Sequence, residues 1–418
     1  MLLYFHGKFI PKSLIIHLNK GRKHMQRLKD YDFTLMITPI LLAAFGMVMI
    51  YSSSMVIAVV GGHESTFYLF KQMRWFVLGL IGFAVCSVFP YKKYHKIVKF
   101  IILITGALLV AVLIFGVTVN NAKSWFVIGP VSFQPAEIAK LAVILYLASV
   151  YSKKQEYIRD FTQGVLPPLI ITGGILALVV AEPDIGTSSI IAMIAATIII
   201  SSGIRFRHIF LLVLVGVLFL SLVIPQMVTD TRINRFTGAY QPFEAPDDVG
   251  YHLIQSYLAI GVGGITGEGL GQSVQKLGYL FGPHTDFIMA IIAEELGFIG
   301  VFIVIGLLAL IVLRGIFIAR KCRDSFGALL AIGISSMVGI QAFINLGSIS
   351  GILPITGVTL PFISYGGSSL LVLMISMGIL NNIAKSTKEA EKDPKTGHRQ
   401  DMRMSRIYGG RRWHTRAN

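Results

Sequence analysis

Long apolar runs separated by polar connections make up most of the chain. An α-helix needs about 20 mostly apolar residues to cross a bilayer. Ten runs come near that length, at residues 33–52, 73–90, 100–119, 135–151, 164–181, 185–204, 209–228, 287–313, 325–346 and 362–383. This pattern predicts an all-α polytopic membrane protein with ten transmembrane helices.

Composition agrees with the membrane class. Hydrophobic residues make up 54% of the chain and charged residues 14%, whereas an average soluble chain has about 45–50% apolar and about 25% charged residues. This balance excludes a soluble enzyme. The net charge of +16 comes from Lys and Arg between the runs and in the terminal segments, so we expect no nucleic-acid partner. The two cysteines, Cys86 and Cys322, lie far apart in sequence and both near the inner side of the expected topology, so neither a disulfide framework nor a zinc site is expected.

The distribution of positive charge predicts the orientation. Most of the 37 Lys and Arg residues fall in the terminal segments and in every second connection. These residues favour the cytoplasmic side, so we expect both termini inside the cell and the protein in the cytoplasmic membrane. We expect a basic segment at 1–30, a membrane domain at 31–384 and a disordered basic tail at 385–418. The first segment could be disordered or could lie on the inner leaflet.

The largest connection, residues 229–285, joins the seventh and eighth runs on the outer side. Connections longer than about 12–15 residues are usually functional or disordered. Segment 251–260 places its apolar residues on one helical face, which predicts a re-entrant or interfacial helix. The glycine-rich run 261–271 fits no nucleotide-binding pattern. A tight turn is favoured there over contact between backbone amides and a phosphate.

Asp286 follows this loop at the start of the eighth run, with His284 close by. A carboxylate at a helix N-terminus is commonly a cap. A carboxylate that the helix dipole keeps ionised could also accept a proton from a hydroxyl group. Both readings of Asp286 remain open from the residues alone.

Carboxylates inside the runs have a different expected role. Glu294 and Glu295 lie deeper in the eighth run, where charge is costly, and we expect them first to pair with polar groups on other helices. Glu137 and Lys140 stand three residues apart and can pair on one helix face.

Polar residues at the outer corners are candidates for substrate binding. Lys and Arg side chains beside glycines suit an anionic headgroup such as a diphosphate. The candidates are Lys123, Arg235, His284, Glu182, Asp184, Gln255, Ser364 and Ser368. Metal-ligand spacing is not visible, so any metal ligands are unknown.

Six motifs in sequence order resemble the SEDS family of bacterial membrane proteins (shape, elongation, division and sporulation). They are Tyr51-Ser-Ser-Ser54, Phe133-Gln-Pro-Ala-Glu-Ile-Ala-Lys140, Glu182-Pro-Asp-Ile-Gly-Thr187, the glycine run, His284-Thr-Asp-Phe287 with Ala293-Glu-Glu-Leu-Gly297, and Leu353-Pro-Ile-Thr-Gly357 with Leu360-Pro-Phe-Ile-Ser-Tyr-Gly-Gly-Ser-Ser369. The resemblance covers about residues 31–383 and is greatest to the division branch of a Gram-positive organism. The chain departs from the family pattern at Gly282, where many relatives carry Glu, and at Thr359, where Pro is usual.

The resemblance implies a ten-helix peptidoglycan glycosyltransferase that polymerises lipid II at the outer face of the cytoplasmic membrane, with Asp286 as the catalytic residue. It also implies inverting glycosyl transfer, septal location, a class B penicillin-binding protein and other divisome proteins as partners, and a divalent cation, Mg or Mn. An elongation or sporulation polymerase of the same family is an alternative. A lipid II flippase that uses Glu294 or Glu295, or a scaffold for a transpeptidase, would be different classes of protein.

Overall fold

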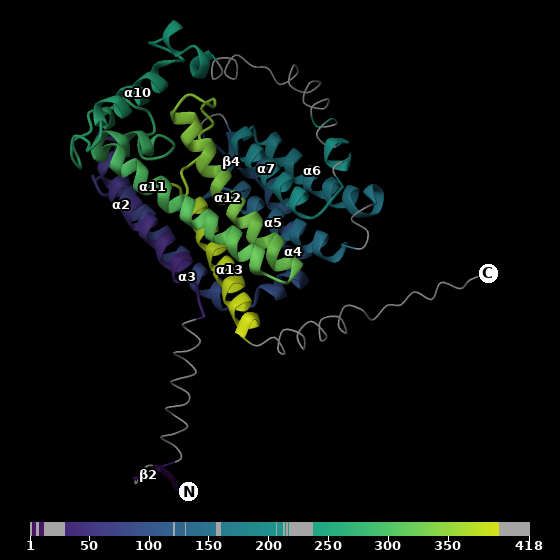
Figure 1. Ribbon diagram of the computed structural model, residues 1–418. Coiled ribbons are helices and arrows are strands. Elements are labelled where there is room, and N and C mark those ends of the chain that lie inside the picture. Colours follow the sequence, from purple (N-terminus) through teal and green to yellow (C-terminus); the bar gives the residue numbers. More distant parts are fainter. Residues whose placement is uncertain are drawn as a thin grey trace.

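The computed structural model describes residues 2–5, 8–11, 30–119, 122–129, 131–155, 160–205, 207–211, 214, 216 and 237–392. Within these ranges eight helices are long and apolar enough to cross a membrane. They are α2 (Phe33–Val60), α3 (Phe67–Val88), α4 (Tyr94–Phe115) with the preceding turn η1 (Tyr91–Lys93), α5 (Pro135–Lys153), α6 (Leu166–Ala181) with the preceding turn η2 (Phe161–Val165), α11 (Ile288–Lys321), α12 (Ser325–Ile349) and α13 (Gly367–Lys392). Figure 1 shows that they form one bundle.

Two of the ten expected spans are not among these eight. The sixth is α7 (Ile185–Ser201), an apolar helix that is shorter than the others. The seventh, residues 209–228, lies almost entirely outside the described residues. The all-α membrane architecture is therefore confirmed, and the count of ten stays a prediction.

Local sequence explains where several helices begin. Asp32, Asp184 and Asp324 precede α2, α7 and α12, and each side chain accepts hydrogen bonds from amides of the first turn. An aspartate in this position satisfies N–H groups that have no partner within the helix. Proline stands at the start of α5 and α6, where its missing N–H costs nothing.

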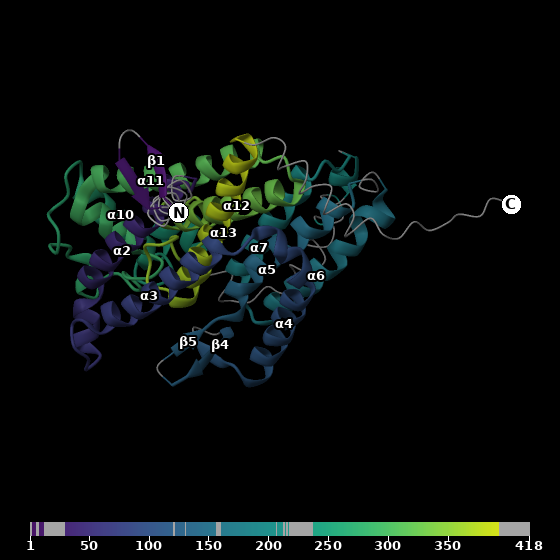
Figure 2. The same cartoon turned by 90° about the horizontal axis from the view of Figure 1, so that it is seen from below.

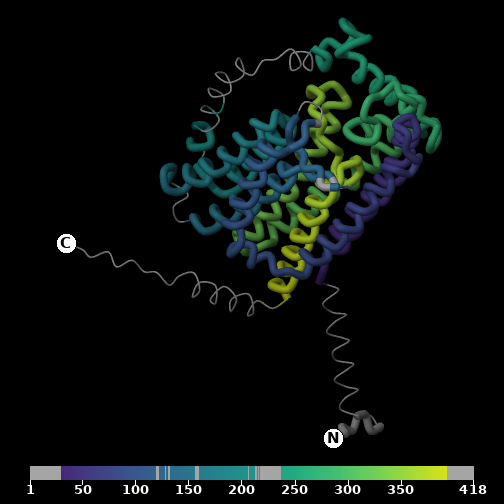
Figure 3. Tube along the Cα trace, turned by 180° about the vertical axis from the view of Figure 1, so that it is seen from behind, coloured from purple at the N-terminus to yellow at the C-terminus, as the bar shows by residue number. Residues whose placement is uncertain are grey.

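The centre of the bundle consists of α5, α12 and α13. The most apolar stretches of these helices are 78%, 67% and 83% buried, against 17% for α3 and 22% for α4. Helix α13 runs along α3 and beside α2 (Figure 3). Leucine, isoleucine and phenylalanine remain exposed on the peripheral helices, as expected for surfaces that face lipid tails.

Short strands interrupt the helical pattern. Strands β1 (Leu2–Phe5) and β2 (Lys8–Pro11) pair antiparallel, and β3 (Val117–Val119), β4 (Ala122–Ile128) and β5 (Val131–Phe133) form a second antiparallel sheet. Figure 2 shows β4 and β5 beside α4 and away from α10. The third span was predicted to reach residue 119, but α4 ends at Phe115. Gly116 and the β-branched residues after it favour extended backbone over helix.

The C-terminal end of α13 corrects the expected tail boundary. The helix continues past residue 384 to Lys392 instead of becoming disordered at 385. Lys388 donates to the Tyr31 carbonyl at 3.1 Å, and Lys392 forms an ion pair with Asp30. These contacts order the last turns of α13 and place them beside the start of α2, at the end of the bundle opposite α10 (Figure 1).

The connection expected on the outer side, called the outer loop below, carries α10 (Tyr251–Gly263) and two short turns, η3 (Pro242–Glu244) and η4 (Gln275–Leu277). The expected helix at 251–260 is thus confirmed. It packs against α11, and Ser256 Oγ donates to the Ile349 carbonyl at the end of α12, at 3.2 Å.

Helix α11 is broken one third of the way along. Gly297 has φ 64° and ψ −163°, which lie outside the helical region. In a continuous helix the amides of Phe298 and Ile299 would donate to the carbonyls of Glu294 and Glu295. The break therefore frees two donors and two acceptors, and in the membrane region such groups need protein partners.

The glycine-rich run supplies those partners. The two freed amides donate to the carbonyls of Gly264 and Ile265, at 2.9 and 3.2 Å, and the two freed carbonyls accept from the amides of Glu268 and Gly269, at 2.9 and 3.0 Å. A Cβ atom on Gly267 would overlap the backbone of α11, so this approach requires glycine. The tight-turn reading of the run is confirmed, because these amides already bind protein carbonyls rather than remaining available to a phosphate.

Candidate functional site

Asp286 lies in the turn that leads into α11. The N-cap residue is Phe287, and it makes no side-chain capping bond. The half-buried Asp286 carboxylate accepts a hydrogen bond from Thr285 Oγ1 at 2.8 Å. Asp286 is therefore not the capping residue of α11, and its carboxylate is held beside the helix start by the turn itself.

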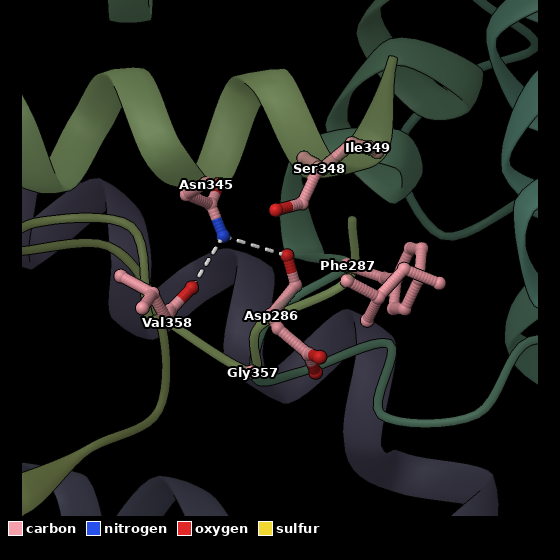
Figure 4. A pocket seen from close by; sticks show the side chains of 8 residues that line it. Asp286, Phe287, Asn345, Ser348, Ile349, Gly357 and Val358 are labelled. Carbon is pink, nitrogen blue, oxygen red and sulfur yellow. Dashed lines mark hydrogen bonds between the residues drawn. The ribbon is translucent and has the colours of Figure 1, made fainter. Parts of the chain in front are cut away.

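Asn345 of α12 fixes the backbone at this point. Its Nδ2 donates to the Asp286 carbonyl at 2.8 Å and to the Val358 carbonyl at 2.7 Å. A small pocket opens here, lined by Asp286, Phe287, Asn345, Ser348, Ile349, Ile355, Gly357 and Val358. In Figure 4 the Asp286 carboxylate points away from Asn345, so the Asn345 amide orients the backbone of Asp286 and not its carboxylate.

Two histidines stand near this turn in different environments. His284 is 8% exposed, and its ring contacts Tyr68 and Tyr365 with centroid distances of 4.5 and 5.6 Å. Burial lowers the pKa of His284 to about 4, so the ring is neutral at pH 7 and adds no positive charge for a diphosphate. Burial also lowers the pKa of His252 on α10, and the negative charge of Asp286 opposes that shift.

The corner between α6 and α7 holds Glu182 and Asp184. Asp184 accepts from the Thr187 amide at 2.9 Å and from Gln134 Nε2 at 2.7 Å. Glu182 is fully buried, and neither carboxylate oxygen meets a hydrogen-bond donor within the described ranges. Burial, followed by the Asp184 charge, raises the pKa of Glu182 to about 8.

This corner is connected to the Asp286 pocket through one loop. A Cβ atom on Gly186 would come within 3.0 Å of both the Thr356 carbonyl and the Val358 side chain. The α12–α13 loop therefore packs on the Glu182 corner, and Gly357 and Val358 of the same loop line the pocket.

A buried polar chain runs beneath the loop. Lys140 pairs with Glu137 at 2.8 Å, as expected, and also donates to Gln341 Oε1 at 3.1 Å. Gln341 Nε2 continues the chain to the Thr359 carbonyl at 3.1 Å. The pair predicted from spacing is confirmed as part of a larger network that joins α5 and α12 to the loop.

Ser364 and Ser368 are buried and do not line the pocket. Ser364 Oγ accepts from the Leu360 amide at 2.8 Å, which closes the turn before α13. The Ser364 carbonyl accepts from Gln72 Nε2 of α3 at 3.4 Å. These contacts support the loop, and substrate contact by either serine stays a prediction.

Glu295 binds another span, as expected, whereas Glu294 binds groups of the loop before α11. Glu295 binds Lys276 at 2.7 Å and accepts from Ser52 Oγ of α2 at 2.7 Å. Glu294 accepts from the Val274 amide at 2.8 Å and from the Ser273 hydroxyl.

The remaining candidates lie apart from the pocket lining or outside the description. Lys123 lies on β4 and donates to the Ile114 carbonyl at the end of α4, at 2.9 Å. Gln255 lies on α10, one turn after His252. Arg235 is outside the described residues.

Sequence reasoning missed three residues that shape this region. Asn345 and His252 were not predicted as candidates, because the first lies within an apolar run and the second within a loop helix. Lys276 was given no role from the sequence, although it is 1% exposed and paired. A polar amide in an apolar run was the available signal for Asn345, since such groups need buried partners.

These features define a polytopic membrane protein in which a loop turn with Asp286 and a buried carboxylate corner lie on either side of the α12–α13 loop. Residues 33–389 match the family model described as "Cell cycle protein", the family of FtsW, RodA and SpoVE. The chain belongs to this family, which is the SEDS family that its motifs resemble.

Individual relatives agree with this assignment. The chain is 49% identical over 378 residues to the probable peptidoglycan glycosyltransferase FtsW of Bacillus subtilis, covering 88% of this chain and 94% of that protein. It is 39% identical over 360 residues to stage V sporulation protein E of the same organism, covering 85% and 98%.

Solved structures confirm the fold. A chain from a structure described as "Structural coordination of polymerization and crosslinking by a peptidoglycan synthase complex" matches with a TM-score of 0.70 and 28% identity, covering 85% of this chain and 98% of that one. The rod shape determining protein RodA of Thermus thermophilus matches with a TM-score of 0.63 and 27% identity, covering 85% and 97%.

Proposed function

We propose that this protein is a peptidoglycan glycosyltransferase of the FtsW type, which polymerises lipid II during cell division. The observation that carries the proposal is the Asp286 turn, where a half-buried carboxylate borders a pocket and Asn345 holds its backbone. The higher identity to FtsW than to the sporulation relative, 49% against 39%, favours the division role over sporulation.

The reaction assigns one task to Asp286. Its carboxylate accepts the proton of the acceptor sugar's 4-hydroxyl while that oxygen attacks the anomeric carbon of the donor. The bond from this carbon to the lipid diphosphate breaks, the diphosphate leaves with the electron pair, and the configuration inverts. The Asn345 amide keeps the base in place between α12 and the α12–α13 loop.

Substrate contacts are assigned to the polar groups around this turn. Lys123 and Arg235 bind the anionic diphosphate, and Glu182, Asp184, Gln255, His284, Ser364 and Ser368 shape the binding region. The connection of the Glu182 corner to the pocket through Gly186 and the α12–α13 loop supports this assignment. Reduced lipid II binding by Lys123→Ala, with unchanged thermal stability, would support the role of its ammonium group.

A flippase that works through Glu294 or Glu295 is disfavoured by their contacts. Both carboxylates bind groups of the outer loop, and Glu295 also binds α2. A proton or substrate relay would have to break these buried contacts in each cycle.

The proposal includes ten spans with both termini in the cytoplasm. The position of α10 at one end of the bundle and of the α2 start and α13 end at the other supports it (Figure 1). A cysteine introduced at Glu244 should react with an impermeant maleimide in whole cells, and one introduced at Lys392 should react only after permeabilisation. The reverse pattern would contradict the orientation.

A class B penicillin-binding protein and other divisome proteins are the proposed partners, and the peptidoglycan synthase complex among the similar structures supports the first. The use of a divalent cation by this protein also stays a prediction. No three His, Cys, Asp or Glu side chains gather to hold a metal within the described part of the chain. No reaction step is therefore assigned to a metal.

The function is tested by polymerisation of purified lipid II in proteoliposomes, with the protein alone and with its transpeptidase partner. Glycan chains should form with the wild type and should be absent with Asp286→Asn at the same protein level. A wild type that moves lipid II across the bilayer but forms no glycan would instead identify a flippase.

A further inference from the structure

A buried ion pair lies deeper in α11 than the pocket. Lys276 Nζ and Glu295 Oε1 are 2.7 Å apart, and their side chains are 1% and 0% exposed. Lys276 belongs to η4 in the outer loop, whereas Glu295 lies just before the break in α11. The pair therefore connects the outer loop to the first segment of the broken helix.

Ser52 adds a third element to this contact. Its hydroxyl donates to Glu295 Oε1 at 2.7 Å, and Lys276 Nζ lies 3.0 Å from the same Ser52 Oγ. Ser52 is on α2, so three separate parts of the chain meet at one buried cluster. We call Lys276, Glu295 and Ser52 the Lys276 anchor.

Glu294, which precedes Glu295 in sequence, binds the start of the same turn, η4. Its carboxylate accepts from the amides of Val274 and Gln275, at 2.8 and 3.4 Å, and from the Ser273 hydroxyl. The two neighbouring carboxylates thus hold both the backbone and the lysine of η4.

The anchor constrains the path of the chain to Asp286. The segment after η4 leaves the anchored turn and enters α11 at Ile288, so both of its ends are attached to the same short helical segment. Within it, Leu280 N donates to the Gln275 carbonyl at 2.9 Å and Thr285 N donates to the Gly282 carbonyl at 3.0 Å. Two backbone hydrogen bonds thus order part of the segment between the anchor and the proposed base.

A buried ion pair adds little to the free energy of unfolding, because desolvation offsets most of its attraction. It does fix the relative position of the two side chains, since charged hydrogen-bond partners tolerate few alternative arrangements. We propose that Lys276 and Glu295 are positioning residues, which hold the Asp286 carboxylate at the height and angle that proton transfer requires. This inference rests on the proposed function of Asp286.

The test compares four variants in the proteoliposome assay with the transpeptidase partner present. Lys276→Met and Glu295→Gln each break the pair. The exchange Lys276→Glu with Glu295→Lys restores a pair in the reverse order. Arg314→Met is the matched control, because it breaks the ion pair with Asp32 at the opposite end of the bundle. Thermal unfolding and membrane level are measured for every variant.

We expect kcat to fall about 10- to 100-fold in Lys276→Met and in Glu295→Gln, with KM changed less than about threefold. Misplacement of a reacting group acts on the chemical step. The exchange variant should recover most of kcat, and Arg314→Met should keep wild-type kcat per folded molecule. Should a single variant not accumulate, Ser52→Ala serves as a milder break, with a smaller fall in kcat expected.

The proposal is overturned if anchor variants lose activity only in proportion to lost folded protein, or if the exchange variant regains stability but not kcat. Failure of the proposed function gives a different result. In that case the wild type forms no glycan, or Asp286→Asn still forms it.

Discussion

Two buried carboxylates at opposite ends of the bundle, Asp32 and Glu182, have opposite surroundings. At the end that we propose to be cytoplasmic, the inner end, Asp32 caps α2, pairs with Arg314 at 2.8 Å and donates its own amide to Asn381. At the opposite end, the proposed outer end, Glu182 is buried without a hydrogen-bond donor among the described residues. Polar groups that are fully paired stabilise a fold, whereas groups left under-paired mark sites where the fold gives up stability for chemistry.

Backbone geometry shows the same contrast. Positive φ angles are frequent in the outer loop and at the α11 break, at Gly264, Gly267, Gly269, Gly271, Gly278, Gly282 and Gly297. Helices α12 and α13 reach the inner end without such residues inside them. Unusual backbone therefore gathers around the proposed base, where it shapes the approach to Asp286.

The largest expected effect comes from substituting matched aspartates at the two ends. Asp286→Asn should reduce polymerisation about 10²- to 10⁴-fold, the usual contribution of a general base. Asp324→Asn should leave both activity and stability near wild type, because asparagine caps a helix about as well as aspartate. Initial rates of glycan formation at equal protein levels measure the difference. Equal losses in both variants would remove the functional distinction between the ends.

The second prediction concerns the insertion of the outer loop into α11. Gly267→Val should destabilise the protein by about 3 kcal/mol or more, since a side chain there meets the α11 backbone and φ is +78°. Gly306→Ala, in the same helix, has open space around its Cβ position and should stabilise by about 0.5–1 kcal/mol. Thermal unfolding in one detergent compares them. If Gly267→Val unfolded at the wild-type temperature, the glycine-rich run could move away from the α11 break without loss in the free energy of unfolding.

Much of the regular architecture could be predicted from the apolar runs. The helices are long and apolar, and capping aspartates stand just before several of them, so their existence followed from the pattern. The ends were less predictable. Gly116 ended α4 early, and contacts with Tyr31 and Asp30 extended α13, because tertiary partners decide the last turns of a helix.

The site could be predicted only in part. Asp286 stood out through its place before a helix, and Glu137 with Lys140 stood out through spacing. The partners of Glu295 could not be found in this way, since Ser52 is separated from it by 243 positions. No local pattern encodes such a contact, and the insertion of the glycine run into α11 is hidden for the same reason.

The third prediction tests the inner end. Arg314→Met removes the charged partner of the buried Asp32 carboxylate, and we expect a loss of about 1–3 kcal/mol in the free energy of unfolding. The Asp32 capping bonds to the first turn of α2 remain, which limits the loss. Polymerisation per folded molecule should not change. A fall in kcat without a fall in stability would show that the inner end takes part in function.

The last prediction concerns Glu182 and appears only as a dependence of stability on pH. Its pKa is raised to about 8 in the folded protein by burial and by Asp184, from the ordinary value of 4.5. Between these values the folded state keeps a proton that the unfolded state has released, so this group makes stability fall as pH rises from about 4.5 to about 8. Glu182→Gln stays neutral, and its stability relative to the wild type should therefore increase over that window, by at most about 1.4 kcal/mol for each pH unit. Unfolding midpoints of both proteins at pH 5, 6.5 and 8 measure the trend, with Gly306→Ala, which changes no titratable group, as a control that should show none. A constant difference between wild type and Glu182→Gln across the window would mean that Glu182 is ionised in the folded state and has found a partner.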